Sequence, residues 1–153
     1  MTPRAYDVDL RDLRALLDGE DDPIARMATV SALLKSRDPR ISWVGFYRRI
    51  GPDLLILGPF QGPVACLRIR VGQGVCGAAA AQGKPLLVED VHAFPGHIAC
   101  DPLARSELVL PVFDEGGETV LAVLDLDSYE RAAFTEADRE GLMTIAGLIY
   151  GEG

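Results

Sequence analysis

The sequence lacks long apolar runs and clusters of positive charge. No apolar stretch reaches the roughly 18 residues that a membrane-spanning helix needs, and the start of the chain lacks the basic-then-apolar order of a signal peptide. The chain has 15 Lys and Arg against 23 Asp and Glu, a formal net charge of -8. Because nucleic acids and anionic membranes both attract clustered positive charge, we expect a protein that binds neither. The lack of a membrane span and of a signal peptide leads us to expect it in the cytoplasm.

Cysteine and histidine are also scarce, with three Cys and two His in 153 residues. Three thiols cannot form a closed set of disulfides, and structural disulfides are disfavoured in the cytosol. A reactive or redox-cycling thiol is one interpretation, and a small buried hydrophobic residue is the alternative for each Cys. All five residues fall within 66–107, a stretch rich in Gly and Pro, so we expect the chemistry there.

The length and the 48% hydrophobic content suit one compact domain over residues 1–153. Leucines at helical spacing predict a helix over 8–17, and Asp22 followed by Pro23 predicts the start of a second helix. Thr135, with an acidic residue three positions later, predicts the start of a last helix.

Six segments rich in apolar and β-branched residues, joined largely by turn signals, predict strands. They are 42–50, 54–58, 65–70, 85–88, 108–113 and 119–127. The order of these elements predicts an α+β fold with a six-stranded antiparallel sheet flanked by helices, on which the helices of residues 1–40 pack.

Strand periodicity places several side chains on common faces. Trp43 and Tyr47 are four positions apart on the first strand, with Gly45 between them. Ordinary core packing explains these aromatics, and a small ligand over Gly45 is the functional alternative. Asp125 and Asp127 are two positions apart on the last strand, so both carboxylates face the same side.

Two of the cysteines lie in distinct predicted local structures. Cys66 falls in the strand 65–70, where it shares a face with Arg68 and Arg70, and a thiol near cations ionises more easily. Cys76 is predicted at or near the N-terminus of an Ala-rich helical turn, where free amides can also hold a carboxylate. Packing in a helix of small residues is the alternative for Cys76.

The segment 92–106, which carries Cys100, is too long and irregular to be a mere connection and is a candidate wall or lid of an active site. A hydrolase could use Cys100 with His97 or His92, but nothing in the sequence specifies that geometry. Possible metal ligands are Cys66, Cys76, His92, His97 and Cys100. None has the close paired spacing of zinc sites, so we expect no metal.

What the sequence does supply is a possible nucleophilic thiol, two thiols able to resolve it, and the acids Glu107, Asp125 and Asp127. This is the set of groups needed to reduce an oxidised sulfur through a sulfenic acid and a disulfide. Clustered carboxylates help because like charges force one of them to keep its proton near neutral pH.

These motifs closely resemble the free methionine-(R)-sulfoxide reductases, which are single GAF domains. The matching segments are WVGFY, LGPFQG, GVCG, EDVHAFPGHIACD, SELVLP, VLDLDS and FTEADREGL. They cover nearly everything from Trp43 onward, and the order and spacing of Cys66, Cys76 and Cys100 agree with the family pattern. The helices before Trp43 match only in kind.

The resemblance implies a role for each thiol. Cys100 would attack the sulfoxide sulfur, Cys66 would be the main resolving thiol, and Cys76 would be a second exchange partner. The product would be methionine together with an intramolecular disulfide that thioredoxin reduces. The family also implies a homodimer and no cofactor.

The resemblance also assigns the pocket. Glu107, Asp125 and Asp127 would polarise or protonate the sulfoxide oxygen and hold the substrate's ammonium group, with Glu107 and Asp127 counted as catalytic and Asp125 as substrate-binding. Trp43 and Tyr47 would enclose the methyl-sulfur end, and backbone amides near the Gly-rich segments would bind the carboxylate. Such a pocket would reject a methionine sulfoxide inside a protein, which has neither end free.

Two alternatives from other classes stay open. A GAF sensor module would bind a small ligand or report redox state without turnover, and it would have to signal through a partner. A structural domain would need all three thiols to be buried and unreactive, which titration of the thiols in the native protein would test.

Overall fold

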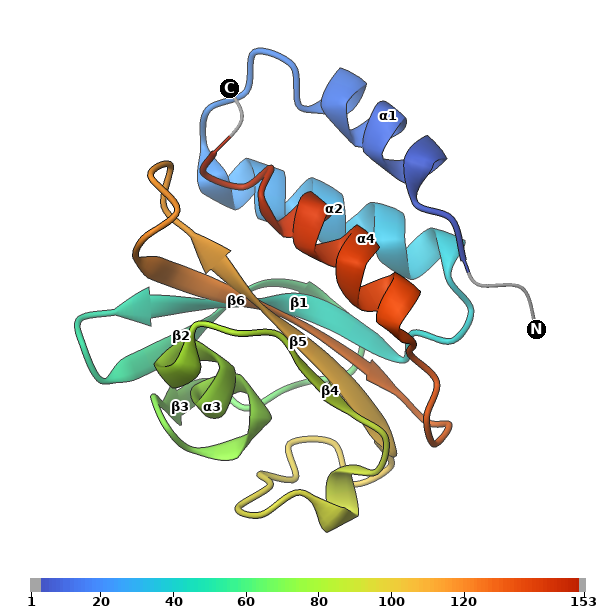
Figure 1. Cartoon of the computed structure of the whole chain (residues 1–153), viewed down its shortest axis with the longest axis vertical. Coiled ribbons are helices and arrows are strands. Elements are labelled where there is room, and N and C mark those ends of the chain that lie inside the picture. Colours follow the sequence, from blue (N-terminus) through green and yellow to red (C-terminus); the bar gives the residue numbers. More distant parts are fainter. Residues whose placement is uncertain (1–3, 152–153) are drawn as a thin grey trace.

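The computed structural model describes residues 4–151; residues 1–3 and 152–153 of the expected domain lie outside the described residues. A six-stranded antiparallel sheet, in the order β3-β2-β1-β6-β5-β4, has α1, α2 and α4 on one side and α3 on the other (Figure 1). The elements are α1 (Asp7–Leu16), α2 (Pro23–Arg37), β1 (Trp43–Ile50), β2 (Leu54–Gln61), β3 (Arg68–Arg70), α3 (Gly74–Gln82), β4 (Leu86–Val88), the short 3-10 helix η1 (Val91–Ala93), β5 (Ser106–Phe113), β6 (Val120–Ser128) and α4 (Glu136–Ala146). The predicted α+β class and six-stranded sheet are confirmed.

The predicted helix starts are confirmed by their caps. The Asp22 side chain accepts a hydrogen bond from the backbone N–H of Ile24, with Pro23 in the first turn of α2. At α4, Thr135 and Asp138 satisfy each other's backbone N–H in a capping box. Within residues 4–151, no helix has the length and apolar content needed to cross a bilayer.

Alternation along the central strands divides the core in two. On one face of the sheet, Val44, Phe46, Leu108, Leu110, Leu124 and Leu126 pack in one cluster with buried residues of the helices α1, α2 and α4. On the other face, Trp43, Tyr47, Val109 and Val123 pack in a second cluster with Val75, Cys76, Ala79 and Ala80 of α3. Both faces of β1, β5 and β6 are therefore covered, which explains their nearly continuous apolar sequences.

Strand β2 is longer than predicted and runs to Gln61. Gly45 of β1 pairs with Phe60 of β2, and a Cβ at Gly45 would collide with the Phe60 side chain. Because position 45 has no side chain, the turn-like GPFQ segment continues as a strand beside β1. In contrast, β3 is shorter than predicted and covers only Arg68–Arg70.

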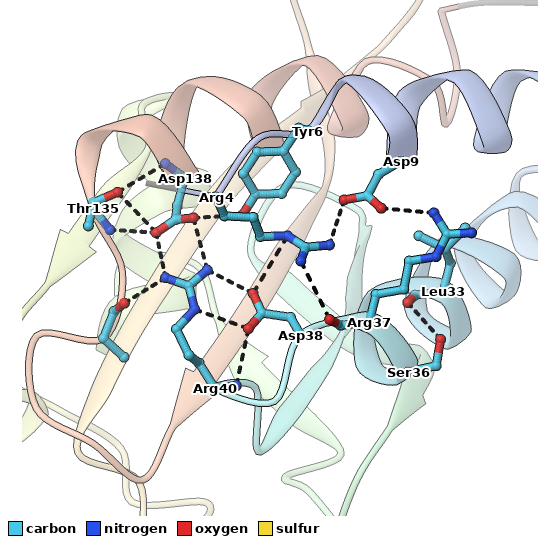
Figure 2. Close-up of polar contacts among 11 residues, drawn as sticks. Arg4, Tyr6, Asp9, Leu33, Ser36, Arg37, Asp38, Arg40, Thr135 and Asp138 are labelled. Atoms are coloured by element: carbon cyan, nitrogen blue, oxygen red, sulfur yellow. Dashed lines mark hydrogen bonds and ion pairs between the residues drawn. The ribbon is translucent and has the colours of Figure 1, made fainter. Parts of the chain in front are cut away.

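An ion network around Arg40 joins the N-terminal segment, the α2–β1 connection and α4 (Figure 2). The two terminal nitrogens of Arg40 each donate to Asp138 at 2.9 Å. The Arg40 Nε and Nη2 donate to Asp38 at 3.0 and 2.7 Å. The Tyr6 hydroxyl donates to Asp138 Oδ1 at 2.7 Å. Since Asp38 and Asp138 are both buried, their charges depend on this guanidinium.

Arg40→Met should destabilise the protein strongly, because it leaves Asp138 buried without its cation and Asp38 with only Arg4, whose Nε lies 3.9 Å from Asp38 Oδ2. Removing one partner of a buried pair costs about 3–5 kcal/mol. The Arg40 side chain is 20% exposed, so we expect about 3 kcal/mol, measured by urea unfolding. The control Arg139→Ala loses only an exposed pair with Glu136 and should cost less than about 1 kcal/mol. Equal losses in the two variants would contradict the role of Arg40.

Candidate active site

A pocket lies between the sheet, the N-terminal end of α3 and the segment that carries Cys100. Five predicted site residues line it from the sheet side: Trp43, Tyr47, Glu107, Asp125 and Asp127. The strand register explains this, because Asp127 of β6 lies opposite Trp43 of β1 and Glu107 of β5. Residues directly opposite, and those two positions further along, share one face of a sheet. The predicted common face for the two aspartates is confirmed.

The aromatic residues combine core packing with a place in the pocket wall. The Trp43 ring lies 6.0 Å from the Tyr47 ring and 5.4 Å from the Phe60 ring. Trp43 Nε1 donates to the Pro63 carbonyl at 3.1 Å, and the Tyr47 hydroxyl donates to the Cys66 carbonyl at 2.9 Å. Both polar tips are thus anchored to the segment before β3, which fixes the rings that face the pocket.

The ligand position considered over Gly45 is closed. A Cβ at Gly45 would meet the side chain of Phe60 and, at 2.8 Å, the Cη2 atom of Trp43. The alternative of a ligand over Gly45 is therefore wrong, because Phe60 fills that space. Core packing of the two aromatics is observed, and both also line the pocket.

The carboxylates lie in an environment that favours their protonated forms. Glu107 is 6% and Asp125 5% exposed. Burial, followed by the charges of Asp125 and Asp127, raises the pKa of Glu107 well above its usual value. Burial also raises the pKa of Asp125, and burial with the charge of Asp125 raises that of Asp127. Burial and mutual repulsion thus favour the protonated forms of Glu107 and Asp127, so the cluster can act as an acid.

Cys76 is the third residue of α3, as predicted for a position near a helix N-terminus. Its thiol is buried and lies 3.9 Å from Glu107 Oε2. A helix N-terminus ordinarily favours a thiolate. Here burial, together with the charges of Asp125 and Glu107, raises the pKa of Cys76 well above its usual value. The thiol form is therefore favoured, because burial and the acids on β5 and β6 outweigh the helix N-terminus.

Cys66 and Cys100 form a disulfide, with their Cα atoms 5.3 Å apart, and Cys76 is free. Cys66 precedes β3, so the prediction that it shares a strand face with Arg68 and Arg70 is wrong. The disulfide ties this irregular segment to Cys100 instead of letting it pair as a strand.

The two bonded cysteines differ in their relation to the pocket. Cys100 lines it, together with the adjacent Asp101. Cys66 does not, although the preceding residues Val64 and Ala65 do. Asp101 was not predicted as a site residue, although an acidic residue next to a candidate nucleophile is a usable sequence signal.

The histidines do not assemble a hydrolase site. His97 lines the pocket, whereas His92 does not, and their ring centroids lie 6.4 Å apart. Burial and the nearby charge of His92 lower the pKa of His97. No hydrogen bond joins either histidine side chain to Cys100 in the described residues, and in this oxidised form Cys100 is bonded to Cys66. The five metal candidates are likewise not brought together as ligands, since two of them are consumed by this bond.

Comparisons with known proteins give the family of the chain. The GAF domain family matches residues 27–149. The free methionine-R-sulfoxide reductase of Escherichia coli is 48% identical over 132 residues, which cover 86% of this chain and 78% of that protein. The chain belongs to the free methionine-(R)-sulfoxide reductase family of GAF domains. The resemblance inferred from the motifs is thus confirmed.

Two solved structures of this reductase family superimpose over most of both chains. The reductase of Neisseria meningitidis, solved in complex with its substrate, is 40% identical, covers 97% of this chain and 92% of its own, and has a TM-score of 0.86. The reduced form of the Staphylococcus aureus protein is also 40% identical, covers 97% of each chain and has a TM-score of 0.90. The GAF fold is therefore established on both sequence and structure.

The raised pKa of Glu107 predicts a pH dependence of stability. The folded protein keeps protons that the unfolded chain releases above about pH 4. This contribution to stability is present at low pH and declines as the pH rises towards the folded-state pKa, by at most about 1.4 kcal/mol per pH unit for each proton. Glu107→Gln cannot ionise, so it should gain stability relative to the native protein between pH 5 and pH 8.

Urea unfolding at several pH values, with the disulfide intact, measures this difference. The matched control is Glu115→Gln at an exposed position, which should follow the native pH profile. Parallel profiles for Glu107→Gln and the native protein would show that Glu107 ionises as in the unfolded chain, against the burial argument.

Proposed function

We propose that the protein reduces free L-methionine-(R)-sulfoxide to methionine. The observation that carries this proposal is the Cys66–Cys100 disulfide, in which Cys100 lines a pocket of buried carboxylic acids. Near full-length similarity to the Escherichia coli and Neisseria meningitidis reductases supports the choice of substrate. An inert structural domain does not account for two bonded cysteines at the edge of a polar pocket.

We assign the attacking sulfur to Cys100. Cys76 also lines the pocket, but it is buried beside Glu107 and its pKa is raised, so little of it is thiolate. Cys100 is only partly buried, and once reduced it presents its thiol to the pocket. Its thiolate attacks the sulfoxide sulfur, the S–O bond breaks, and the oxygen passes with a proton to Cys100 as a sulfenic acid while methionine leaves.

Cys66 then resolves the sulfenic acid. The Cys66 sulfur attacks the Cys100 sulfur, a water molecule leaves, and the disulfide seen in the structure forms. A dithiol reductant, which we propose is thioredoxin, returns two electrons and two protons and regenerates both thiols. Cys76 remains available as a second exchange partner at the base of the pocket.

The acids supply the proton and the binding charge. Glu107 and Asp127 are placed opposite each other and their pKa values are raised, so they can protonate the sulfoxide oxygen as it develops charge. Asp125, whose Oδ1 has no hydrogen-bond partner among the described residues, is suited to accept from the substrate's ammonium group.

The other parts of the substrate also find complementary groups. The N-terminus of α3 presents Gly74 and Val75 to the pocket, and Gln73 at its N-cap makes no side-chain cap, so backbone amides there can bind the carboxylate. Trp43 and Tyr47 would enclose the methyl-sulfur end. Because both charged ends are bound, a methionine sulfoxide within a polypeptide would be excluded.

We also propose that the chain acts as one domain over 1–153 and as a homodimer. The first is supported by solved relatives that cover 97% of the chain, and the second by the family resemblance.

The purified protein should release methionine from the free (R)-sulfoxide, and not from the (S) epimer or from a blocked peptide form. Methionine is quantified with a thioredoxin system and, separately, with dithiothreitol as reductant. Release of methionine with dithiothreitol but not with the thioredoxin system would show that the substrate is right and the proposed reductant is wrong. No methionine from any form, with the thiols confirmed reduced, would favour the alternative of a ligand-binding GAF sensor.

Single-turnover experiments on the pre-reduced protein should separate the roles of the cysteines. Cys100→Ser should release no methionine, because the attacking sulfur is lost. Cys66→Ser should release about one methionine per enzyme and then recycle poorly, because the sulfenic acid has lost its main partner. Arg139→Ala, on the exposed face of α4, serves as the active control. Near-normal release by Cys100→Ser would show that another thiol attacks the substrate.

A further inference from the structure

Three metal-ligating groups from three different elements converge in the pocket. The Cys76 sulfur of α3 and one carboxylate oxygen each from Glu107 of β5 and Asp125 of β6 all lie within 4.8 Å of one another. All three side chains are buried. The cluster is therefore fixed by packing of the sheet against α3 rather than by a flexible surface.

The surroundings of this cluster favour a cation. Glu107, Asp125 and Asp127 line the pocket with Asp101, and no Lys or Arg of the described chain lines it. Asp125 is 5% exposed, and its Oδ1 makes no hydrogen bond within residues 4–151. Buried carboxylates ordinarily have a hydrogen-bond donor, a paired charge or a metal ion, so an unpartnered oxygen on a residue that lines the pocket points to a missing positive ligand.

We propose that Cys76, Glu107 and Asp125 bind a thiophilic divalent cation of the Zn²⁺ class, and that binding releases the protons of the Cys76 thiol and the Glu107 carboxyl to solvent. One sulfur and two carboxylate oxygens, with a water in the fourth position, complete a tetrahedral site of the kind that zinc adopts. Bond lengths of about 2.0–2.3 Å require the ligand atoms to approach by on the order of 1 Å, which side-chain rotation can provide. The sulfur ligand selects against Mg²⁺ and Ca²⁺, which prefer oxygen alone.

This site makes the metal a competitor of the substrate. The competition rests on the proposed function, in which Asp125 binds the substrate's ammonium group and Glu107 protonates the sulfoxide oxygen. A Zn²⁺ ion on the same oxygens excludes both interactions. The metal acts as an inhibitor and takes no part in turnover.

Calorimetric titration of ZnCl₂ into the full-length oxidised protein tests the site, because the Cys66–Cys100 bond leaves Cys76 as the free thiol. We expect one site that millimolar Mg²⁺ does not displace. Cys76→Ala and Asp125→Asn should each raise the Kd for Zn²⁺ at least tenfold. Glu115→Gln, and the pair His92→Ala with His97→Ala, should leave it within about twofold. An unchanged Kd in Cys76→Ala, or loss of binding in the histidine variant, would overturn the proposal.

A second readout does not depend on the variants folding. Cd²⁺ bound to the native oxidised protein should show thiolate-to-metal charge-transfer absorption, since Cys76 is its sulfur ligand. Bound Cd²⁺ without this absorption would also overturn the proposal. Thermal melts of both variants in the absence of metal identify any loss of fold.

Displacement by methionine sulfoxide separates this proposal from the proposed function. We expect the free (R)-sulfoxide, titrated against the Zn²⁺-loaded oxidised protein, to raise the apparent Kd for Zn²⁺. Binding that depends on Cys76 but resists displacement would confirm the metal site and contradict the placement of the substrate on Asp125.

Discussion

The antiparallel register of β1, β6 and β5 is the constraint on which both the core and the pocket depend. Because side chains alternate along each strand, pairing Trp43 with Asp127 puts the leucines of the same strands on the opposite face, against α2 and α4. A shift of one residue would turn three acids into the helical core and the leucines towards α3. The apolar packing on one side therefore fixes the position of the acids on the other, and the site needs no separate scaffold.

This fold contains two groups of buried carboxylates. One group is paired with a cation and stabilises the structure, and the other lines the pocket. Asp38 and Asp138 are matched by Arg40, with further donors from Tyr6 and the start of α4. Burial opposes ionisation of Asp138, but the Arg40 guanidinium lowers the pKa of that carboxyl. The same network joins the N-terminal part of the chain to α4. Glu107, Asp125 and Asp127 line a pocket without such a cation among the described residues. Burying them costs stability, and what the protein gains is acidity and affinity for positive charge near neutral pH.

Local sequence patterns predicted those features that depend on interactions between residues close together in the chain. The caps at Asp22 and Thr135 and the shared face of the two aspartates on β6 follow from spacing alone. Patterns failed where a distant residue decides the outcome: β2 continues to Gln61 because Phe60 packs against Gly45 of the neighbouring strand. The disulfide joins residues 34 positions apart, and spacing alone does not pair them. The redox roles of the thiols came from the family resemblance.

The three thiols share one small region, yet each lies in a different physical environment. Cys66 lies outside the pocket wall, Cys100 lines it, and Cys76 lies at its base against the acids. Sequence spacing alone cannot separate them, because the distinction arises from which strand or helix covers each sulfur. Burial, together with the neighbouring acids, disfavours ionisation of Cys76, and the disulfide joins Cys66 to Cys100. In the proposed function, the acids that would donate a proton to the substrate oxygen would therefore also leave the attack to Cys100.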